Sequence, residues 1–266
     1  ISGIWYLNPY LNDTDPSYIS QGNSELDSEK SHAFNLSYSN FTQKFNINLS
    51  ARYSFTNNSI ENVTKLMPDT EIEGLKNPTG KDVLYSTYAN IGKTRRASVS
   101  AYVNWNATPR TRIYMNMSGD YSYMEGSEGM RNDGWSLFAY GGAQQTLPHD
   151  WRISLNVFGQ TPWIMLQGKG SSFFDYGLSV NKSFLNKRLT LSAFASNFFK
   201  KYMDQSSTTE GAGFIRESSY KYSRQRFGIS VSYRIGELKA SVKKAARTIS
   251  NDDVKSGGSG SGGGGE

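Results

Sequence analysis

The chain has 266 residues, of which 36% are hydrophobic and 14% aromatic, with a formal net charge of +6 and no cysteine. Its mean hydropathy is −0.58, and no apolar stretch approaches the roughly 20 residues that a membrane-spanning helix needs, which excludes a helical membrane protein. The aromatic content argues against a disordered chain. The lack of cysteine excludes a disulfide framework, a thiolate zinc site and a catalytic thiol.

Residues 1–30 are polar and rich in turn-forming residues, and we interpret them as an external loop region leading into the first strand. The chain opens on Ile1 without a signal peptide, so we expect it to be the carboxy-terminal part of a larger protein. Nine stretches then alternate apolar with polar residues and each predicts a strand. They are 31–40, 43–60, 83–107, 110–124, 134–147, 151–166, 172–185, 188–203 and 214–235.

The second of these strands shows the alternation most clearly. Its apolar positions are Phe45, Ile47, Leu49, Ala51, Tyr53 and Phe55, and polar residues lie between them. Successive side chains of a strand point to opposite faces of a sheet. The pattern therefore predicts one face for lipid and one for water, as in a transmembrane β-barrel.

The connections between the predicted strands alternate strictly in length. Four are very short, and the others, at 61–82, 125–133, 167–171 and 204–213, are longer or richer in glycine and polar residues. Tight turns in the periplasm and long loops outside are typical of outer-membrane barrels. We therefore predict an all-β, antiparallel up-and-down meander over 31–235, forming a partial transmembrane β-barrel of about nine strands as an open curved sheet.

Aromatic residues of the apolar face gather near the two ends of the strands, as amphipathic rings do at membrane interfaces. Ordinary β-propensity is the alternative explanation. The predicted lipid-interface aromatics are Phe45, Trp105, Trp151 and Tyr233 at the turn end, and Tyr53, Phe55, Tyr121, Tyr123, Trp135, Phe174 and Tyr176 at the loop end.

The opposite face carries amides and a few charges that we predict to line a water-filled lumen, where they offer hydrogen bonds to a solute or a plug. Simple hydration of a pore wall is the alternative. The predicted lumen-facing residues are Asn46, Asn48, Arg52, Asn104, Asn116, Asp120, Tyr140, Gln144, Arg152, Asn156 and Asp175.

Two cations fall on the apolar face. Lys93 and Arg95 lie about ten residues above Trp105, a separation close to one membrane crossing. Arginine costs about 2–4 kcal/mol at mid-bilayer but little at an interface, so we predict that both contact lipopolysaccharide phosphates in the outer leaflet. Solvated charges above the membrane are the alternative.

The sequence contains few candidate catalytic residues. His32 and His149 are the only histidines and lie far apart in the predicted meander. We expect no enzyme activity, no cofactor and no metal. The basic residues form no stripe beside stacking aromatics, so we also expect no nucleic-acid partner.

The alternation stops after the ninth strand. Residues 236–266 contain a short basic stretch and end in SGGSGSGGGGE, which predicts a flexible glycine- and serine-rich tail. If the last strand runs down from an external loop, this tail lies in the periplasm.

Several stretches resemble the outer-membrane β-barrel family of Bacteroidetes, which is similar to the barrel portion of TonB-dependent receptors. The stretches include GNSELDSEKSH from Gly22, YSTYANIGKTRRASVSAYVNW from Tyr85, QQTLPHDWRISLN from Gln144 and SRQRFGISVSYRIGELKASVKKAARTISNDDVK from Ser223. The resemblance implies a barrel of about 22 strands that encloses an amino-terminal plug and imports bulky nutrients with energy relayed through TonB. No plug or TonB-contacting segment is present in these residues.

We therefore interpret the chain as the wall-forming part of an outer-membrane receptor of this type. Its expected partners are outer-membrane lipid and lipopolysaccharide, the missing amino-terminal strands and plug, and TonB through that plug. A barrel used for adhesion or surface display without active import, and a soluble β-sheet module that binds glycans, are the alternatives.

Overall fold

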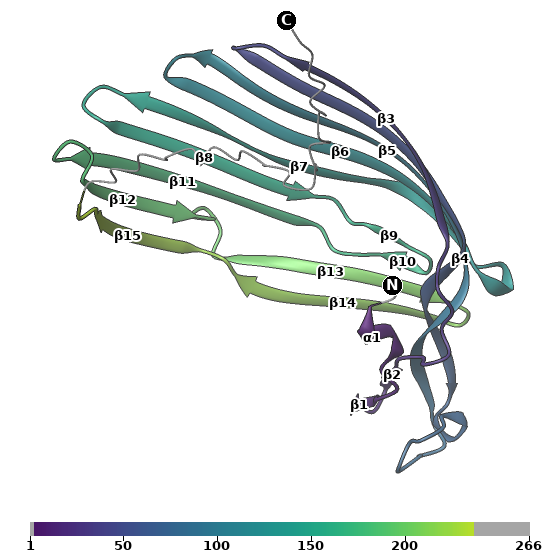
Figure 1. The fold of residues 1–266 in the computed structure, drawn as a ribbon. Helices are drawn as coiled ribbons and strands as arrows, with labels where there is room; N and C mark the ends of the chain where they lie inside the picture. The colour runs from purple at the N-terminus through teal and green to yellow at the C-terminus, as the bar shows by residue number, and fades with distance from the viewer. Residues whose placement is uncertain (1–2, 237–266) are drawn as a thin grey trace, which may run out of the picture. The chain divides into compact units, whose positions relative to one another are not determined.

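The computed structural model describes residues 3–236, and the predicted tail beyond Gly236 lies outside the described residues. The described chain folds into a largely antiparallel β-sheet that curves but does not close (Figure 1). The elements before the wall are α1 (Ile4–Leu7), β1 (Leu11–Asp15) and β2 (Tyr18–Gln21). The wall strands are β3 (Ser31–Phe41), β4 (Phe45–Pro68), β5 (Asp82–Thr108), β6 (Thr111–Glu125), β7 (Arg131–Leu147), β8 (Trp151–Gln160), β11 (Phe173–Phe184), β12 (Leu189–Ser196) and β15 (Arg226–Tyr233).

These nine wall strands pair in chain order as an antiparallel meander, which confirms the predicted fold class. Within residues 3–236, β3 pairs only with β4 and β15 only with β12. The sheet is therefore open along both of these strands.

A second, four-stranded sheet forms from the long loops. It contains β9 (Ile164–Met165), β10 (Gly168–Lys169), β13 (Tyr202–Gly211) and β14 (Phe214–Ser223), in the order β14-β13-β10-β9. At the start of the chain, β1 pairs with β2, and β2 adds in parallel to β5 beyond the end of β6. The predicted loop region 1–30 thus contains three short elements.

Short and long connections alternate as predicted, but several strand limits differ. β4 and β5 run on past the predicted strand ends, so 61–82 is mostly a β-hairpin, with the 3-10 turn η1 (Asp69–Glu71) near its tip. The predicted loop 125–133 shortens around a second turn, η2 (Ser127–Gly129). The predicted strand 151–166 ends at Gln160, and 188–203 ends at Ser196.

The largest error concerns residues 204–235. The predicted loop 204–213 is mostly strand, since 204–211 belong to β13, and the predicted single strand 214–235 is two strands, β14 and β15, in different sheets. Residues 204–210 are polar on both faces, so they carry no alternation that reveals a strand. They become one because β14 and β10 supply backbone partners on either side.

Buried apolar side chains gather at the long-loop end and not along the rest of the wall. In residues 3–236 they are Ile19, Val63, Ile72, Val83, Met124, Ile164 and Leu166. Ile19, Ile72 and Val83 form one small core where β2 packs on the β4–β5 hairpin. By contrast, wall side chains such as Val99 and Ile229 are 63% and 82% exposed. No helix among the described residues has the length and hydropathy to cross a membrane.

Candidate functional site

Strand pairing places all eleven predicted lumen residues on the same face of the wall, which we call the polar face. One row of directly opposed residues runs from Asn48 across five further strands to Asp175, and directly opposed side chains lie on the same side. The row consists of Asn48, Tyr102, Asn116, Tyr140, Phe158 and Asp175. That this face lines a lumen stays a prediction.

The predicted interface aromatics lie on the opposite face, which we call the apolar face. At the turn end Phe45 is opposite Trp105, and at the loop end Tyr121 is opposite Trp135, with ring centroids 5.4 Å apart. Lys93 and Arg95 share this face, where Arg95 is opposite Tyr123. Their contact with lipid is likewise a prediction.

Three phenylalanines break the polar pattern of the polar face and form a cluster. Phe138, Phe158 and Phe173 meet edge to face, with centroid distances of 5.2 and 5.1 Å. The Arg224 guanidinium lies over the Phe173 ring at 4.3 Å. The three rings are only half-buried, so aromatic surface stays accessible on the polar face.

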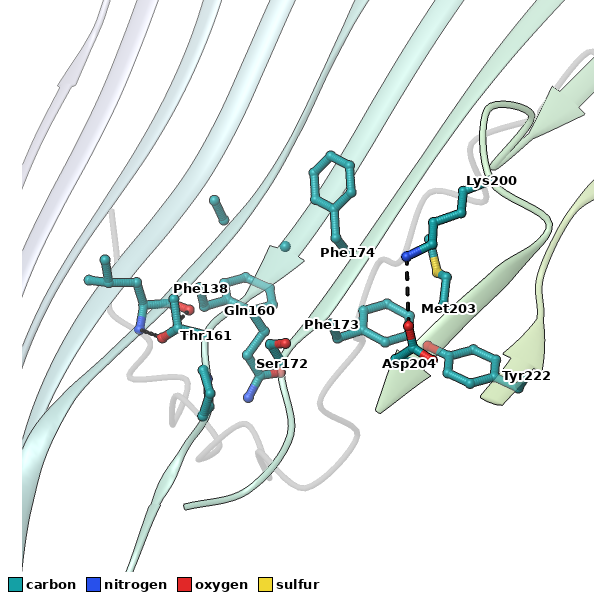
Figure 2. A pocket seen from close by; sticks show the side chains of 14 residues that line it. Phe138, Gln160, Thr161, Ser172, Phe173, Phe174, Lys200, Met203, Asp204 and Tyr222 are labelled. Atoms are coloured by element: carbon teal, nitrogen blue, oxygen red, sulfur yellow. Dashed lines mark hydrogen bonds and ion pairs between the residues drawn. The ribbon is translucent and has the colours of Figure 1, made fainter. Parts of the chain in front are cut away.

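A pocket of about 570 Å³ opens beside this polar-face aromatic cluster (Figure 2). It forms where β8 ends at Gln160 and the chain leaves the wall between β7 and β11. Its walls include Phe138, Gln160, Phe173, Lys200, Met203, Asp204 and Tyr222, together with the apolar-face residues Leu137, Ala139 and Phe174. The Lys200 Nζ and Asp204 Oδ2 atoms lie 3.7 Å apart at its rim. The pocket thus combines aromatic surface with amide and charged groups, the usual composition of a small-molecule site.

Asn197 holds the chain in place beside the pocket. It is 1% exposed and adopts a left-handed φ of +50°, which asparagine tolerates better than most residues. Its side-chain oxygen accepts from the Tyr176 N–H, while its Nδ2 donates to Asp175 and to the Arg224 carbonyl. Arg224 in turn donates to Asp175 at 3.0 Å. These bonds fix where β12 ends and the β13–β14 hairpin departs.

Residues 161–172, which we call the inner segment, cross the polar face at the long-loop end. Ile164 and Leu166 are buried there, and glycines make room for them. A Cβ at Gly134 would lie 2.8 Å from the Ile164 Cδ1, and one at Gly126 would lie 2.6 Å from a Leu166 methyl. Asn132 donates from Nδ2 to the carbonyls of two residues of the segment, Met165 and Gly168.

The Gln167 side chain connects the inner segment to strand β4 of the wall. Its Oε1 accepts from the Thr64 N–H at 2.8 Å, and its Nε2 donates to the Thr64 carbonyl at 3.0 Å. β3 begins at Ser31, opposite Thr56, so the part of the β4 edge beyond Thr56 has no strand partner among residues 3–236. The Gln167 side-chain amide takes the place of a strand partner and satisfies the buried N–H and C=O groups of Thr64.

A carboxyl group lies beneath the inner segment. Glu61 follows a β-bulge at Ser59 and lines a cavity of about 150 Å³ together with Ile164, Leu166 and Gln167. Burial raises the pKa of Glu61 above its usual range, and hydrogen bonds donated by Ser59 and Thr94 oppose this only in part. The Glu61 carboxyl is therefore a pH-sensitive group that lies against the inner segment.

The two histidines remain separate, since His32 stacks on Phe55 at 5.1 Å and His149 lies in a short turn at the other end of the wall. No cluster of three metal-ligating side chains occurs in the described part of the chain. Sequence reasoning missed the functional candidates around the pocket and Gln167. The available signals were the phenylalanines at polar positions of the alternation and the two glycines at 126 and 134.

Replacing Gln167 with alanine leaves the Thr64 backbone groups unpaired. We expect local opening to become easier by about 2 kcal/mol, which corresponds to roughly 30-fold faster amide exchange at Thr64 and along 164–169. Hydrogen exchange followed by mass spectrometry measures this. The matched variant Gln43→Ala, in a short turn, leaves the exchange of these amides unchanged. Equal exchange in Gln167→Ala and wild type would contradict the role of the Gln167 side chain as partner of the Thr64 backbone.

Replacing Glu61 with glutamine is expected to tighten the inner segment only at higher pH. A raised pKa in the folded state means that stability is complete at low pH and is lost as the pH rises through that pKa. Amide exchange of 164–167 therefore slows in Glu61→Gln at about pH 8 and changes little at about pH 4. The exposed Glu125→Gln serves as the control. An equal effect at both pH values would show that charge is not the cause.

Comparison with known proteins agrees with this architecture. The description "Outer membrane protein beta-barrel family" matches residues 2–233, which include the whole wall, the second sheet and the pocket. Comparison with curated proteins gives no match. The family match leaves the soluble glycan-binding alternative without support. The chain belongs to the outer membrane protein beta-barrel family.

Proposed function

We propose that this chain forms part of the wall of a receptor that imports a bulky nutrient across the outer membrane, as TonB-dependent receptors of Bacteroidetes do. The observation that carries the proposal is the pocket of about 570 Å³ beside the polar-face aromatic cluster. A barrel wall that serves only as an anchor has no need of a pocket that combines aromatic, amide and charged groups.

The open edges support a role as one part of a larger wall. Backbone groups cannot stay unpaired in hydrocarbon, because each unsatisfied group costs several kcal/mol. In the membrane, the edges of β3 and β15 therefore require further strands as partners. A plug inside the completed wall and TonB acting through it belong to the same proposal.

Import can be tested with the complete protein in its native bacterium. A deletion strain is expected to leave a defined set of compounds in its spent medium, measured by untargeted mass spectrometry, and a strain without TonB leaves the same set. Phe173→Ala, which removes a ring that lines the pocket, lowers uptake of these compounds about fivefold at low concentration, from the loss of aromatic contact. The matched change on the apolar face, Phe45→Ala at the turn end and away from the pocket, leaves uptake unchanged. If the deletion strain consumed everything that wild type does, adhesion or display would replace import.

The assignment of the two faces can be tested separately, and the absence of cysteine makes this simple. Adjacent single variants Ser100→Cys and Ala101→Cys place a spin label on opposite faces of β5. In reconstituted bilayers, the label at 101 is expected to collide mainly with oxygen, and the label at 100 mainly with a water-soluble nickel chelate. Equal accessibility at both positions would overturn the membrane orientation.

A further inference from the structure

An apolar groove lies on the apolar face of β5, β6 and β7. It has a volume of about 300 Å³ and is centred on Gly119, which stands opposite both Val99 and Leu137. Because glycine has no side chain, the surrounding aliphatic side chains form walls around a low floor. On this face the lining residues are Val99, Ala101, Met117, Gly119, Leu137 and Ala139. A hydrocarbon chain matches this lining.

Beyond the groove, toward the long-loop end, lie three rows of directly opposed residues that carry aromatic and charged side chains. The next row is Ala97, Tyr121 and Trp135, then Arg95, Tyr123 and Asp133, then Lys93, Glu125 and Arg131. With a rise of about 3.3 Å per residue, Arg95 lies about 13 Å and Lys93 about 20 Å along the strand from Val99. The half-thickness of the hydrocarbon core is about 15 Å. When an acyl chain lies in the groove, the cations are therefore at the level of the lipid headgroup.

The charges in these rows are not balanced among themselves. Tyr121 donates from its hydroxyl to Asp133 at 2.7 Å, and Tyr123 donates to Glu125 at 3.4 Å, so both carboxylates have phenol partners. Within residues 3–236, the exposed cations Lys93, Arg95 and Arg131 have no carboxylate within 4.0 Å. Arg131 only stacks over the Tyr123 ring, at 5.2 Å.

We propose that this column binds one phosphorylated, acylated lipid of the outer leaflet, of the lipopolysaccharide class. Lys93, Arg95 and Arg131 hold its phosphate, since arginine and lysine are the usual phosphate partners in proteins. One acyl chain lies in the groove at Gly119, and Tyr121 and Trp135 lie between at interface level. The site rests on the outer-membrane family of the chain and not on import.

The test uses the complete protein, purified in mild detergent, with retained lipopolysaccharide measured by native mass spectrometry. The triple variant Lys93→Ser, Arg95→Ser, Arg131→Ser is expected to lose retention about a hundredfold, or about fivefold for each cation. Arg96→Ser removes a cation from the same strand on the polar face and leaves retention unchanged. Full retention by the triple variant would refute the site.

A second arm separates the lipid from free phosphate. Gly119→Leu fills the groove without a change of charge, and an added Cβ there meets a flexible Leu137 methyl at 3.2 Å and the Trp135 Cζ3 atom at 3.9 Å. We expect it to weaken binding of lipopolysaccharide vesicles while binding of inorganic phosphate stays the same. Ala139→Leu, at the groove edge, provides a second filling variant if Gly119→Leu fails to fold. If both folded variants bound lipopolysaccharide like wild type, the acyl site would be wrong.

Discussion

Backbone pairing along the meander from β3 to β15 is the constraint on which the rest of the molecule depends. Hydrocarbon offers no partner to a peptide group, so a chain can cross it as strands only when neighbours satisfy each other. Pairing imposes a period of two on the side chains, and this separates the two faces of the wall. The exposed aliphatic residues of the apolar face would each gain roughly 1.5–3 kcal/mol on leaving water, so a bilayer would stabilise a wall that has so little core.

At the long-loop end the same chain is stabilised differently. There β4 and β5 continue as a hairpin, and the inner segment and second sheet pack against them, so the buried apolar residues of 3–236 gather at this end. Polar contacts bind these layers to the wall: the Gln167 amide replaces a missing strand at Thr64, and the Arg216 guanidinium lies 3.9 Å from the Tyr18 ring. The loops thereby hold the pocket beside the polar-face aromatic cluster in a defined position.

The wall could be predicted from the sequence because alternation is a local property of each strand. Eight of the nine predicted wall strands were confirmed with some changed limits, and of the ninth, 214–235, only the part from Arg226 onward belongs to the wall. The order of the wall strands and the alternation of short and long connections were confirmed. Prediction failed where a strand lacks alternation or where its phase shifts. Residues 204–210 are polar on both sides, and the bulge at Ser59 shifts the phase of β4, so that 61–68 resembles a loop.

The sequence by itself determined which residues share a face, including the eleven polar residues and the two cations Lys93 and Arg95. Only the tertiary structure decided which of them meet. The Gln167 amide contacts Thr64, 103 residues away, and Arg131 joins Lys93 only through the register of β5, β6 and β7. The physical reason is the distance along the sequence over which each feature is set. The two-residue period arises from the backbone of a single strand. A pocket or a lipid groove requires side chains from separate strands to meet, and this depends on register and sheet curvature.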